Sequence, residues 1–348
     1  YGHNYNRDSR EAVYRFFGKH LIGGRDWDGF TEPAYVKEPD ESLRVFPGEG
    51  KLEGQKGQAE VIADFIAMNR EKWATALPKD RNGLEAFRTA HGTVIGDVLG
   101  VSVPDSNALR RERLSMDRME GYVVERWVFG RAVQGDAVPA LLYRGANADA
   151  NPQDAVVLVH GRGKAALADP ETGGPGPLVR ELVARGAAVL CMDAFLLGEH
   201  QPMDGHRERK AAGNFMDTFQ PTDTGERVQD ILTAMAFLRG RRDLTGAVSL
   251  AGLDEAGLWC LFAAAVDPQI GKVAADLNRF PLDDDNAWVD RQYIPCIRSV
   301  GDVRTALALA APRPCLVMNG ADSGGLGWLG AQLAAAVPEP AALADWLR

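Results

Sequence analysis

The residues whose types and spacing could support chemistry lie in the segment Gly252-Leu253-Asp254-Glu255-Ala256-Gly257. An apolar run over residues 247–251 precedes it, and a segment with helical character follows it. A short strand, a sharp turn and a helix form the setting in which enzymes expose a nucleophile, in the pattern G-x-S-x-G. Asp254 stands where that pattern has its serine. The sequence therefore predicts the scaffold of a nucleophile elbow without its hydroxyl group.

Two chemical roles are open to Asp254. A carboxylate can act as the nucleophile, as in haloalkane dehalogenases and epoxide hydrolases, which then need a histidine to activate the hydrolytic water. The dehalogenases place a tryptophan directly after the aspartate to bind halide, and here Glu255 occupies that position. The plainer interpretation is that Asp254 and Glu255 begin a helix, where free N–H groups and the helix dipole stabilise acids. The sequence favours this second role.

A second motif supplies the other half of such a site. The apolar run 155–160 ends in His160-Gly161-Arg162-Gly163. In α/β-hydrolases the loop after this strand provides one backbone N–H of the oxyanion hole, and glycine lets the backbone approach the substrate oxygen. We therefore expect Gly161, Arg162 and Gly163 to contribute backbone groups, and His160 to be a structural loop residue. Asp193, at the end of the next strand, is expected to cap the following turn.

The sequence offers a candidate for the acid of a catalytic triad but none for its histidine at the usual position. Asp322 follows the apolar run 315–319, where this fold carries the triad acid. The order on the fold is nucleophile, acid, histidine. No histidine follows His206, so a general base cannot come from the usual late loop. His200 and His206 both precede the elbow, and their use would require an unusual geometry.

The elements that must position these residues form an α/β pattern from residue 121 onward. Two antiparallel strands, 122–129 and 138–143, come first. Strands and helices then alternate, which predicts a mostly parallel sheet with helices on both faces, the α/β-hydrolase fold. The predicted strands are 155–160, 187–193, 247–252, 273–277 and 315–319, and the predicted helices are 177–185, 224–239 and 256–266.

The first third of the chain reads as a helical extension. Residues 1–24 predict a helix in which Asp8 is the cap and Glu11 completes a capping box. Residues 25–56 are rich in glycine, proline and charge, and are interpreted as a linker. Helices are expected over 57–77 and 81–99.

The composition is that of a globular protein and argues against several classes of binding partner. The 348 residues are 45% apolar and 25% charged, which is typical of a globular protein. A net charge of −9 argues against nucleic acid or an anionic membrane as partner, and no apolar run is long enough to span a bilayer. The four cysteines are widely spaced and are interpreted as small buried hydrophobic residues. The sequence indicates no metal site and no cofactor.

These residues together resemble the acetylxylan-esterase-like α/β-hydrolases of bacteria, and more closely the second half of their tandem, two-domain members. The resemblance covers nearly the whole chain. Its best markers are residues 2–6 with 9–14, 195–200, 214–230 and 257–260.

The resemblance implies a role for His3, in the sequence His3-Asn4-Tyr5-Asn6. That residue would be the triad histidine of a preceding catalytic domain. Residues 1–24 would then be the C-terminal helix of that domain, 25–120 a linker and helical extension, and 121–348 a degenerate hydrolase domain. The opening at Tyr1 is interpreted as a processed product or a piece of a longer polypeptide. The implied partners are a preceding hydrolase domain and an acetylated carbohydrate. The implied location is periplasmic or extracellular, with the cytoplasm left open.

Three functional hypotheses follow. The first is a catalytically degenerate domain with a structural or substrate-presenting role. The second is an active hydrolase in which Asp254 is the nucleophile and Asp322 the acid, with a histidine recruited from His200, His206 or a neighbouring chain's His3. The third is a carbohydrate-binding module that presents exposed aromatic side chains. Its candidates are Trp259, Trp288 and Trp328, of which Trp259 is expected in the core.

Overall fold

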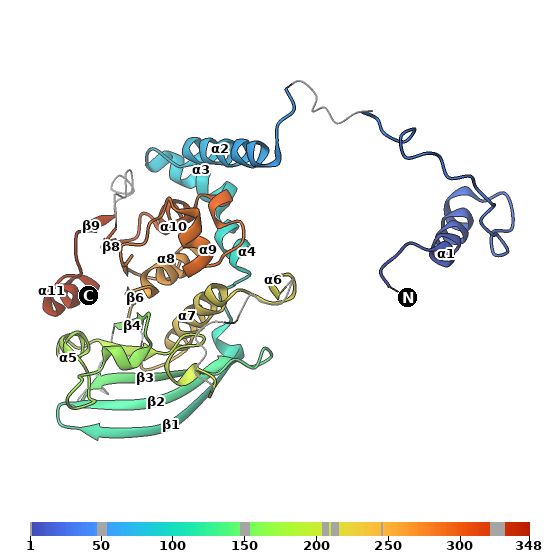
Figure 1. The fold of residues 1–348 in the computed structure, drawn as a ribbon. Helices are drawn as coiled ribbons and strands as arrows, with labels where there is room; N and C mark the ends of the chain where they lie inside the picture. Colours follow the sequence, from blue (N-terminus) through green and yellow to red (C-terminus); the bar gives the residue numbers. More distant parts are fainter. Residues whose placement is uncertain are drawn as a thin grey trace. The chain divides into compact units, whose positions relative to one another are not determined.

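A nine-stranded sheet forms the centre of the larger part of the molecule (Figure 1). The computed structural model describes residues 2–46, 54–146, 154–203, 209, 216–244, 246–320 and 331–348. The chain divides into two compact units, Tyr1–Ala59 and Glu60–Arg348, and the sheet belongs entirely to the second.

The strand order is β1-β2-β3-β5-β4-β6-β7-β8-β9. The first three strands and the β3–β5 pair are antiparallel, and all pairs from β5 to β9 are parallel. The strands are β1 (Leu109–Met119), β2 (Tyr122–Arg131), β3 (Val138–Gly145), β4 (Ala155–His160), β5 (Ala188–Met192), β6 (Val248–Leu253), β7 (Val273–Asp276), β8 (Cys315–Met318) and β9 (Gln332–Ala334). This confirms the predicted mostly parallel α/β-hydrolase sheet.

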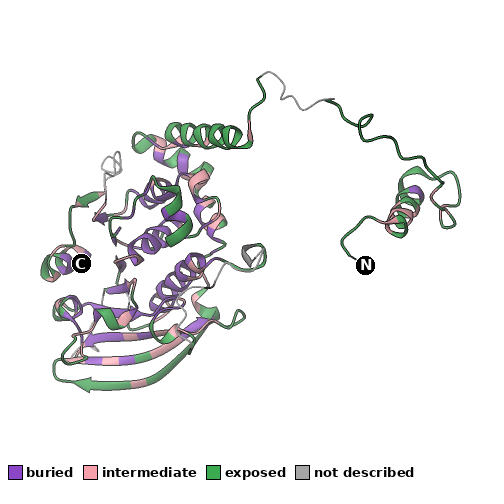
Figure 2. Cartoon of the chain, viewed as in Figure 1, coloured by how far each residue is buried: buried purple, intermediate pink, exposed green. Residues whose placement is uncertain are grey.

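Helices cover both faces of the sheet. On one face lie α5 (Pro177–Ala184) and α11 (Pro340–Leu347), which pack against alternate strand residues such as Val156 and Val189. On the other lie α7 (Asp223–Arg239), α8 (Ala256–Val266) and α10 (Asp302–Ala310). Helices α7 and α8 are buried along almost their whole length (Figure 2). Because the central parallel strands are covered on both sides, they are apolar throughout.

Three helices precede the sheet: α2 (Gln58–Ala76), which belongs to the second unit from Glu60 onward, α3 (Arg81–His91) and α4 (Val94–Leu99). They bury Trp73, Phe87, Ile95 and Leu99 in the same core as α7 and α8. The indole N–H of Trp73 donates to the carbonyl of Ser299, which ties α2 to the loop before α10. These helices are therefore integral to the second unit. The shorter elements are α6 (Met216–Phe219) and α9 (Asp285–Arg291).

The first unit is built around α1 (Arg7–Phe17), which continues into a π-helical turn at Gly18–Ile22. Glu32 folds back onto the helix, where its carboxylate accepts hydrogen bonds from Arg10 at 2.7 and 2.9 Å. Its backbone N–H donates to Glu11 at 2.8 Å. Residues as far as Glu32, within the segment interpreted as a linker, thus contact the helix.

The structure corrects several local expectations. Asn6, and not Asp8, caps α1, because its side chain accepts a hydrogen bond from the backbone N–H of Ser9 at 3.0 Å. The expected helix over 81–99 is two helices, separated at residues 92 and 93. Strand β1 was not predicted, since its polar sequence has no apolar alternation and its residues are largely exposed. Cys191, Cys260 and Cys315 are buried, whereas Cys296 is exposed. Among the described residues, no helix is both long and apolar enough to cross a bilayer.

The antiparallel part of the sheet is fixed by a buried charge. Glu125, fully buried on β2, accepts a hydrogen bond from Arg144 at 2.6 Å and from the Trp127 indole at 2.8 Å. Arg241, from the segment after α7, approaches the same carboxylate at 3.3 Å. Arg113 of β1 lies 3.9 Å from the carboxylate, so three arginines share its charge and it connects β1, β2, β3 and the end of α7.

We expect Glu125→Gln to lower the free energy of unfolding by about 3 kcal/mol, because it removes one partner of a buried ion pair. Urea unfolding followed by circular dichroism measures the change. Glu112→Gln, on exposed β1, is the matched control and should change stability by less than about 0.5 kcal/mol. Equal effects of the two substitutions would contradict the structural role of Glu125.

Phe237 of α7 stacks on Phe129 of β2 with ring centroids 4.4 Å apart, and both rings are fully buried. We expect Phe237→Ala to cost about 3–5 kcal/mol of stability, through lost burial and a residual cavity. Phe219→Ala removes a ring that is 85% exposed and should be close to neutral. The midpoints of denaturant unfolding of the two variants measure this difference in stability. A small effect of Phe237→Ala would show that the core relaxes to fill the space of the removed ring.

Candidate active site

The elbow is present as a strained turn between β6 and α8. Asp254 adopts φ +59°, a left-handed conformation that is uncommon for residues other than glycine. The backbone packs so closely around this turn that its glycine positions have no room for a side chain. A Cβ at Gly257 would lie 1.9 Å from the carbonyl oxygen of Asp276, and one at Gly252 would lie 2.4 Å from that of Ala256. The backbone geometry that exposes a nucleophile is therefore retained.

The Asp254 carboxylate does not cap its own helix. Helix α8 has no side-chain capping bond, and Oδ1 of Asp254 instead accepts a hydrogen bond from the side-chain amide of Asn278, beyond β7. Asp254 and Glu255 stand at the start of α8, as expected. The expected capping bond from Asp254 is not formed, because the left-handed turn directs its side chain toward the neighbouring strand end. Glu255 occupies the N-cap position of α8 without a side-chain capping bond, and its carboxylate pairs with Arg291 at 3.2 Å.

Asp276, at the end of β7, holds the elbow in place. Its Oδ2 accepts the backbone N–H of Asp254 at 2.9 Å. Its Oδ1 accepts the backbone N–H of Asn278 at 2.9 Å and the side-chain amide of Asn319 at 2.8 Å. The side chain is 7% exposed. One buried carboxylate therefore joins the carboxyl ends of β6, β7 and β8.

Asp276 and Asn278 were not among the predicted site residues. The sequence does contain a signal for them, since both follow an apolar strand that is adjacent to the elbow strand. Polar residues at the carboxyl ends of neighbouring parallel strands meet at one edge of the sheet. Asn278 and Asn319 have φ of +46° and +50°, which asparagine tolerates better than most residues.

The loop after β4 lies directly beside the elbow, as predicted. A Cβ at Gly161 would lie 3.0 Å from the backbone nitrogen of Glu255 and 3.2 Å from Oδ2 of Asp254. Only glycine fits there without displacing the turn. The structure therefore brings Gly161, Asp254 and Glu255 together in the arrangement of an oxyanion site.

The backbone donors of this loop are, however, already engaged. The N–H of Gly161 donates to the carbonyl of Leu253 at 3.1 Å, and that of Gly163 donates to the carbonyl of His160 at 2.9 Å. The N–H of Arg162 donates to Nδ1 of His160 at 3.1 Å. An oxyanion hole needs donors directed at the substrate oxygen. In this loop those donors stabilise the loop itself, so the predicted oxyanion role of residues 161–163 is not formed by their N–H groups.

His160 is placed near the elbow but is not poised as a base. Burial lowers the pKa of His160, and the negative charge of Asp254 opposes that effect only in part. The ring is therefore neutral near neutral pH, and its Nδ1 accepts the Arg162 N–H. A neutral imidazole that accepts at Nδ1 carries its proton on Nε2. This state stabilises the loop and leaves Nε2 unable to take a proton.

The loops after β4 and β5 are joined by Asp193. This fully buried carboxylate accepts the backbone N–H of Lys164 at 2.7 Å and that of Glu199 at 2.9 Å. It also forms an ion pair with the Lys164 ammonium group. Asp193 therefore caps the following turn, as expected, and in addition fixes the position of the preceding loop.

His200, one of the histidines considered as a base, lies beside a carboxylate other than that of Asp254. Nδ1 of His200 lies 4.0 Å from Oδ2 of Asp230. Burial lowers the pKa of His200 and raises that of Asp230, so both groups favour their neutral forms. His3 is exposed in the first unit, ahead of α1. Among the described residues, no histidine is hydrogen-bonded to the Asp254 carboxylate.

Other expectations have separate outcomes. Asp322, His206 and Trp328 lie outside the described residues. Trp259 is 1% exposed, as expected for the core, and Trp288 is 3% exposed, so neither is an exposed aromatic platform. In the described part of the chain, no group of three or more histidine, cysteine, aspartate or glutamate residues could hold a metal ion.

Several solved structures of esterases have a fold similar to that of this chain. No protein-family model matches the chain, and no curated protein matches it. A solved Bacteroides fragilis structure, provisionally described as an acetyl xylan esterase, superimposes with a TM-score of 0.61 at 13% identity, over 81% of this chain and 83% of the other. A methylesterase gives 0.55 at 15% identity, over 82% and 67%. A glucuronoyl esterase from Solibacter usitatus gives 0.50 at 14% identity, over 69% and 75%.

At these identities the likeness establishes the fold. The second unit has the α/β-hydrolase architecture of acetyl xylan and glucuronoyl esterases, with Asp254 at its elbow.

Proposed function

We propose that this chain is a carbohydrate-esterase-like α/β-hydrolase domain that no longer performs acyl transfer and has a structural or substrate-presenting role. One observation carries the proposal most directly. The groups that would make the reaction are engaged with the protein itself: the Asp254 carboxylate with Asn278, and the N–H groups of residues 161–163 with neighbouring acceptors.

The argument rests on what acyl transfer requires. A carboxylate nucleophile needs a base that activates the hydrolytic water, and the developing oxyanion needs preorganised donors. Asp254 has an amide donor as its neighbour, which holds the carboxylate but cannot accept a proton. His160 carries its proton on the nitrogen that would have to receive one. Both requirements fail at the same edge of the sheet.

In this proposal the chemistry belongs to a separate hydrolase domain, and acetylated carbohydrate is the proposed substrate class of that domain. The resemblance of the segment around His3 to the end of a catalytic domain motivates this part. Residues 161–163 and Glu255 would then be the remains of a binding pocket.

A second candidate function is hydrolysis with Asp254 as nucleophile. It is favoured by the strained φ of +59°, since non-glycine residues in sparsely populated conformations cluster at functional sites. It also requires an activated water, for which a neutral imidazole with a free acceptor nitrogen is needed. The two candidate functions make different predictions: removal of the Asp254 carboxylate abolishes hydrolysis only if Asp254 is the nucleophile.

We expect the protein to hydrolyse p-nitrophenyl acetate no faster than an equal concentration of the Asp254→Ala variant, within about twofold. Loss of a working nucleophile lowers kcat by roughly 10⁴-fold or more, so the comparison separates the candidates clearly. The assay is spectrophotometric release of p-nitrophenol. Turnover by the wild type that the substitution abolishes would overturn the proposal and establish Asp254 as the nucleophile.

We further expect Asp254→Ser to remain inactive in the same assay. The substitution restores the hydroxyl of the elbow. In the described structure, however, no histidine is hydrogen-bonded at residue 254, and the N–H groups of residues 161–163 are already engaged with other acceptors. Asp254→Asn, which retains the size of the side chain, is the control for folding, with the circular dichroism spectrum as readout. An esterase rate in Asp254→Ser far above that in Asp254→Asn would show that only the hydroxyl had been lost.

A further inference from the structure

His200 and Asp230 bring two buried polar atoms close together without a hydrogen bond between them. His200 ends the short helical turn Gly198–His200 after β5, and Asp230 lies on α7. Nδ1 of His200 and Oδ2 of Asp230 are 4.0 Å apart, beyond hydrogen-bonding distance. Both atoms are buried, and neither has a hydrogen-bond partner in the part of the chain that the structure describes.

The second ring nitrogen of His200 determines which proton the pair lacks. The imidazole donates a hydrogen bond to the carbonyl of Ala194. Because Nδ1 has no partner, the nitrogen that donates is Nε2. Burial lowers the pKa of His200, and the nearby charges of Asp193 and Asp136 oppose that effect only in part. The ring is therefore neutral near neutral pH, and its Nδ1 presents a lone pair toward Asp230.

The surroundings of Asp230 hold a proton on its carboxyl group. Burial raises the pKa of Asp230 well above its usual range, and the charges of Asp136 and Glu226 add to this effect. The backbone N–H of Phe195 and the charge of Arg131 oppose it. An ionised carboxylate has only acceptor atoms, so it would meet the Nδ1 lone pair without a proton between them. One proton shared by the two atoms supplies the missing donor.

The pair lies where the loop after β5 contacts α7. The carbonyl of Phe195 in this loop accepts a hydrogen bond from Arg227 of α7 at 3.2 Å. The Phe195 ring packs edge-on against the imidazole of His200, with centroids 5.4 Å apart. Arg209, which pairs with Asp223 at 2.6 Å, lies 4.8 Å from the centre of the same ring. The proton on the His200–Asp230 pair therefore affects a seam between two elements of the second unit.

We propose that His200 and Asp230 form a proton-dependent latch between the loop at residues 194–200 and α7. While the pair holds its proton, Oδ2 and Nδ1 share it and the loop is fastened. At alkaline pH the proton leaves to solvent, a buried carboxylate then faces an imidazole lone pair, and the loop is released. The latch needs neither a nucleophile nor a substrate, so it is independent of the function proposed for the elbow.

The pH range of the effect follows from the protons bound in each state. In the unfolded chain a histidine is protonated below about pH 6.5 and an aspartate below about pH 3.9. Between these values the folded pair and the unfolded pair each hold one proton, so the raised pKa of Asp230 and the lowered pKa of His200 cancel in their effect on stability. Above about pH 6.5 the unfolded pair holds none, and stability is lost as the pH rises until the folded pair gives up its own proton.

Asp230→Asn tests the shared proton, because the amide of asparagine can donate to Nδ1 at every pH. Urea unfolding of the full chain, followed by circular dichroism, is measured from about pH 6.5 to about pH 8. We expect the unfolding equilibrium constant of the wild type to rise by up to about tenfold per pH unit, and that of Asp230→Asn to rise at least about threefold less per unit. Parallel pH dependence in the two proteins would overturn the latch.

Amide hydrogen exchange of the wild type locates the release and does not depend on a variant. Protection factors of residues 195–200, corrected for the intrinsic pH dependence of exchange, should fall by up to about tenfold per pH unit over the same range. Residues 248–253 of β6 serve as the internal reference and should lose no more protection than the global stability does. Constant protection of residues 195–200 would show that the loop is not held by a proton.

A pair of matched variants tests the charges around Asp230. Nitrogen NMR follows the titration of Nδ1 of His200, whose signal is identified by its absence from His200→Gln. Glu226→Gln removes a charge that raises the pKa of Asp230, so the titration should move to lower pH by about half a unit or more. Asp290→Asn removes an exposed carboxylate that is not among the charges acting on the pair, and should leave the titration unchanged. Equal titrations in these two variants would contradict the proposal.

Discussion

The buried carboxylate of Asp276 is the interaction on which the elbow depends. It accepts the backbone N–H of Asp254 and that of Asn278, and it binds the amide of Asn319. A left-handed residue other than glycine costs roughly 1 kcal/mol or more, and it persists only where its surroundings determine it. Asp276 from one side and the close packing of Gly252 and Gly257 from the other determine it here.

The same constraint explains why Asp254 acts as it does. A turn that projects a side chain away from its own helix denies that side chain the helix N-terminus. The carboxylate then has to find a partner at the neighbouring strand end, and Asn278 provides it. The loop at residues 161–163 shows the same pattern, since its amides are satisfied by Leu253 and His160. At both places polar groups of the site pair with one another.

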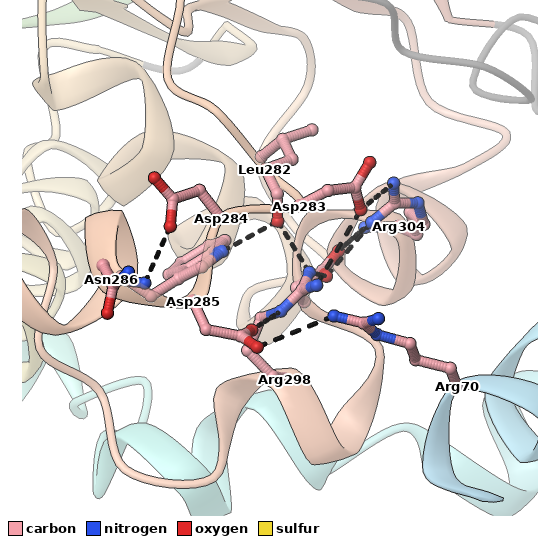
Figure 3. A network of polar contacts seen from close by, with 10 residues as sticks. Arg70, Leu282, Asp283, Asp284, Asp285, Asn286, Arg298 and Arg304 are labelled. Carbon is pink, nitrogen blue, oxygen red and sulfur yellow. Dashed lines mark hydrogen bonds and ion pairs between the residues drawn. The ribbon is translucent and has the colours of Figure 1, made fainter. Parts of the chain in front are cut away.

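A cavity of about 880 Å³ beside α2 follows a different logic. Part of its lining is a network in which Arg298 pairs with Asp285 and Arg304 with Asp283 (Figure 3), and the rest is largely apolar. Helix α9 links the two regions, since Asp285 at its start lines the cavity and Arg291 at its end binds Glu255 beside the elbow. The two regions thus share one short helix while differing in their chemistry.

Local sequence determined the order of most strands and helices, because each central strand is a continuous apolar run and each buried helix has its own apolar pattern. It also located the elbow and its neighbouring loop, since short-range glycine spacing specifies a tight turn. It missed β1, whose polar residues carry no strand signal. It misassigned the cap of α1 and the partner of Asp254, because a hydrogen-bond partner depends on side-chain direction.

Tertiary structure alone decided the contacts made between distant segments. The meeting of Asp254 with Asn278 depends on the parallel register of β6 and β7, which no local pattern encodes. The pairing of Arg298 and Arg304 with Asp283 and Asp302, and the cavity they border, depend on how α2 packs against a loop more than two hundred residues later. The sequence determined which residues could do chemistry, and the packing of sheet and helices decided that those at the elbow hold one another, because the backbone geometry sets where each side chain points.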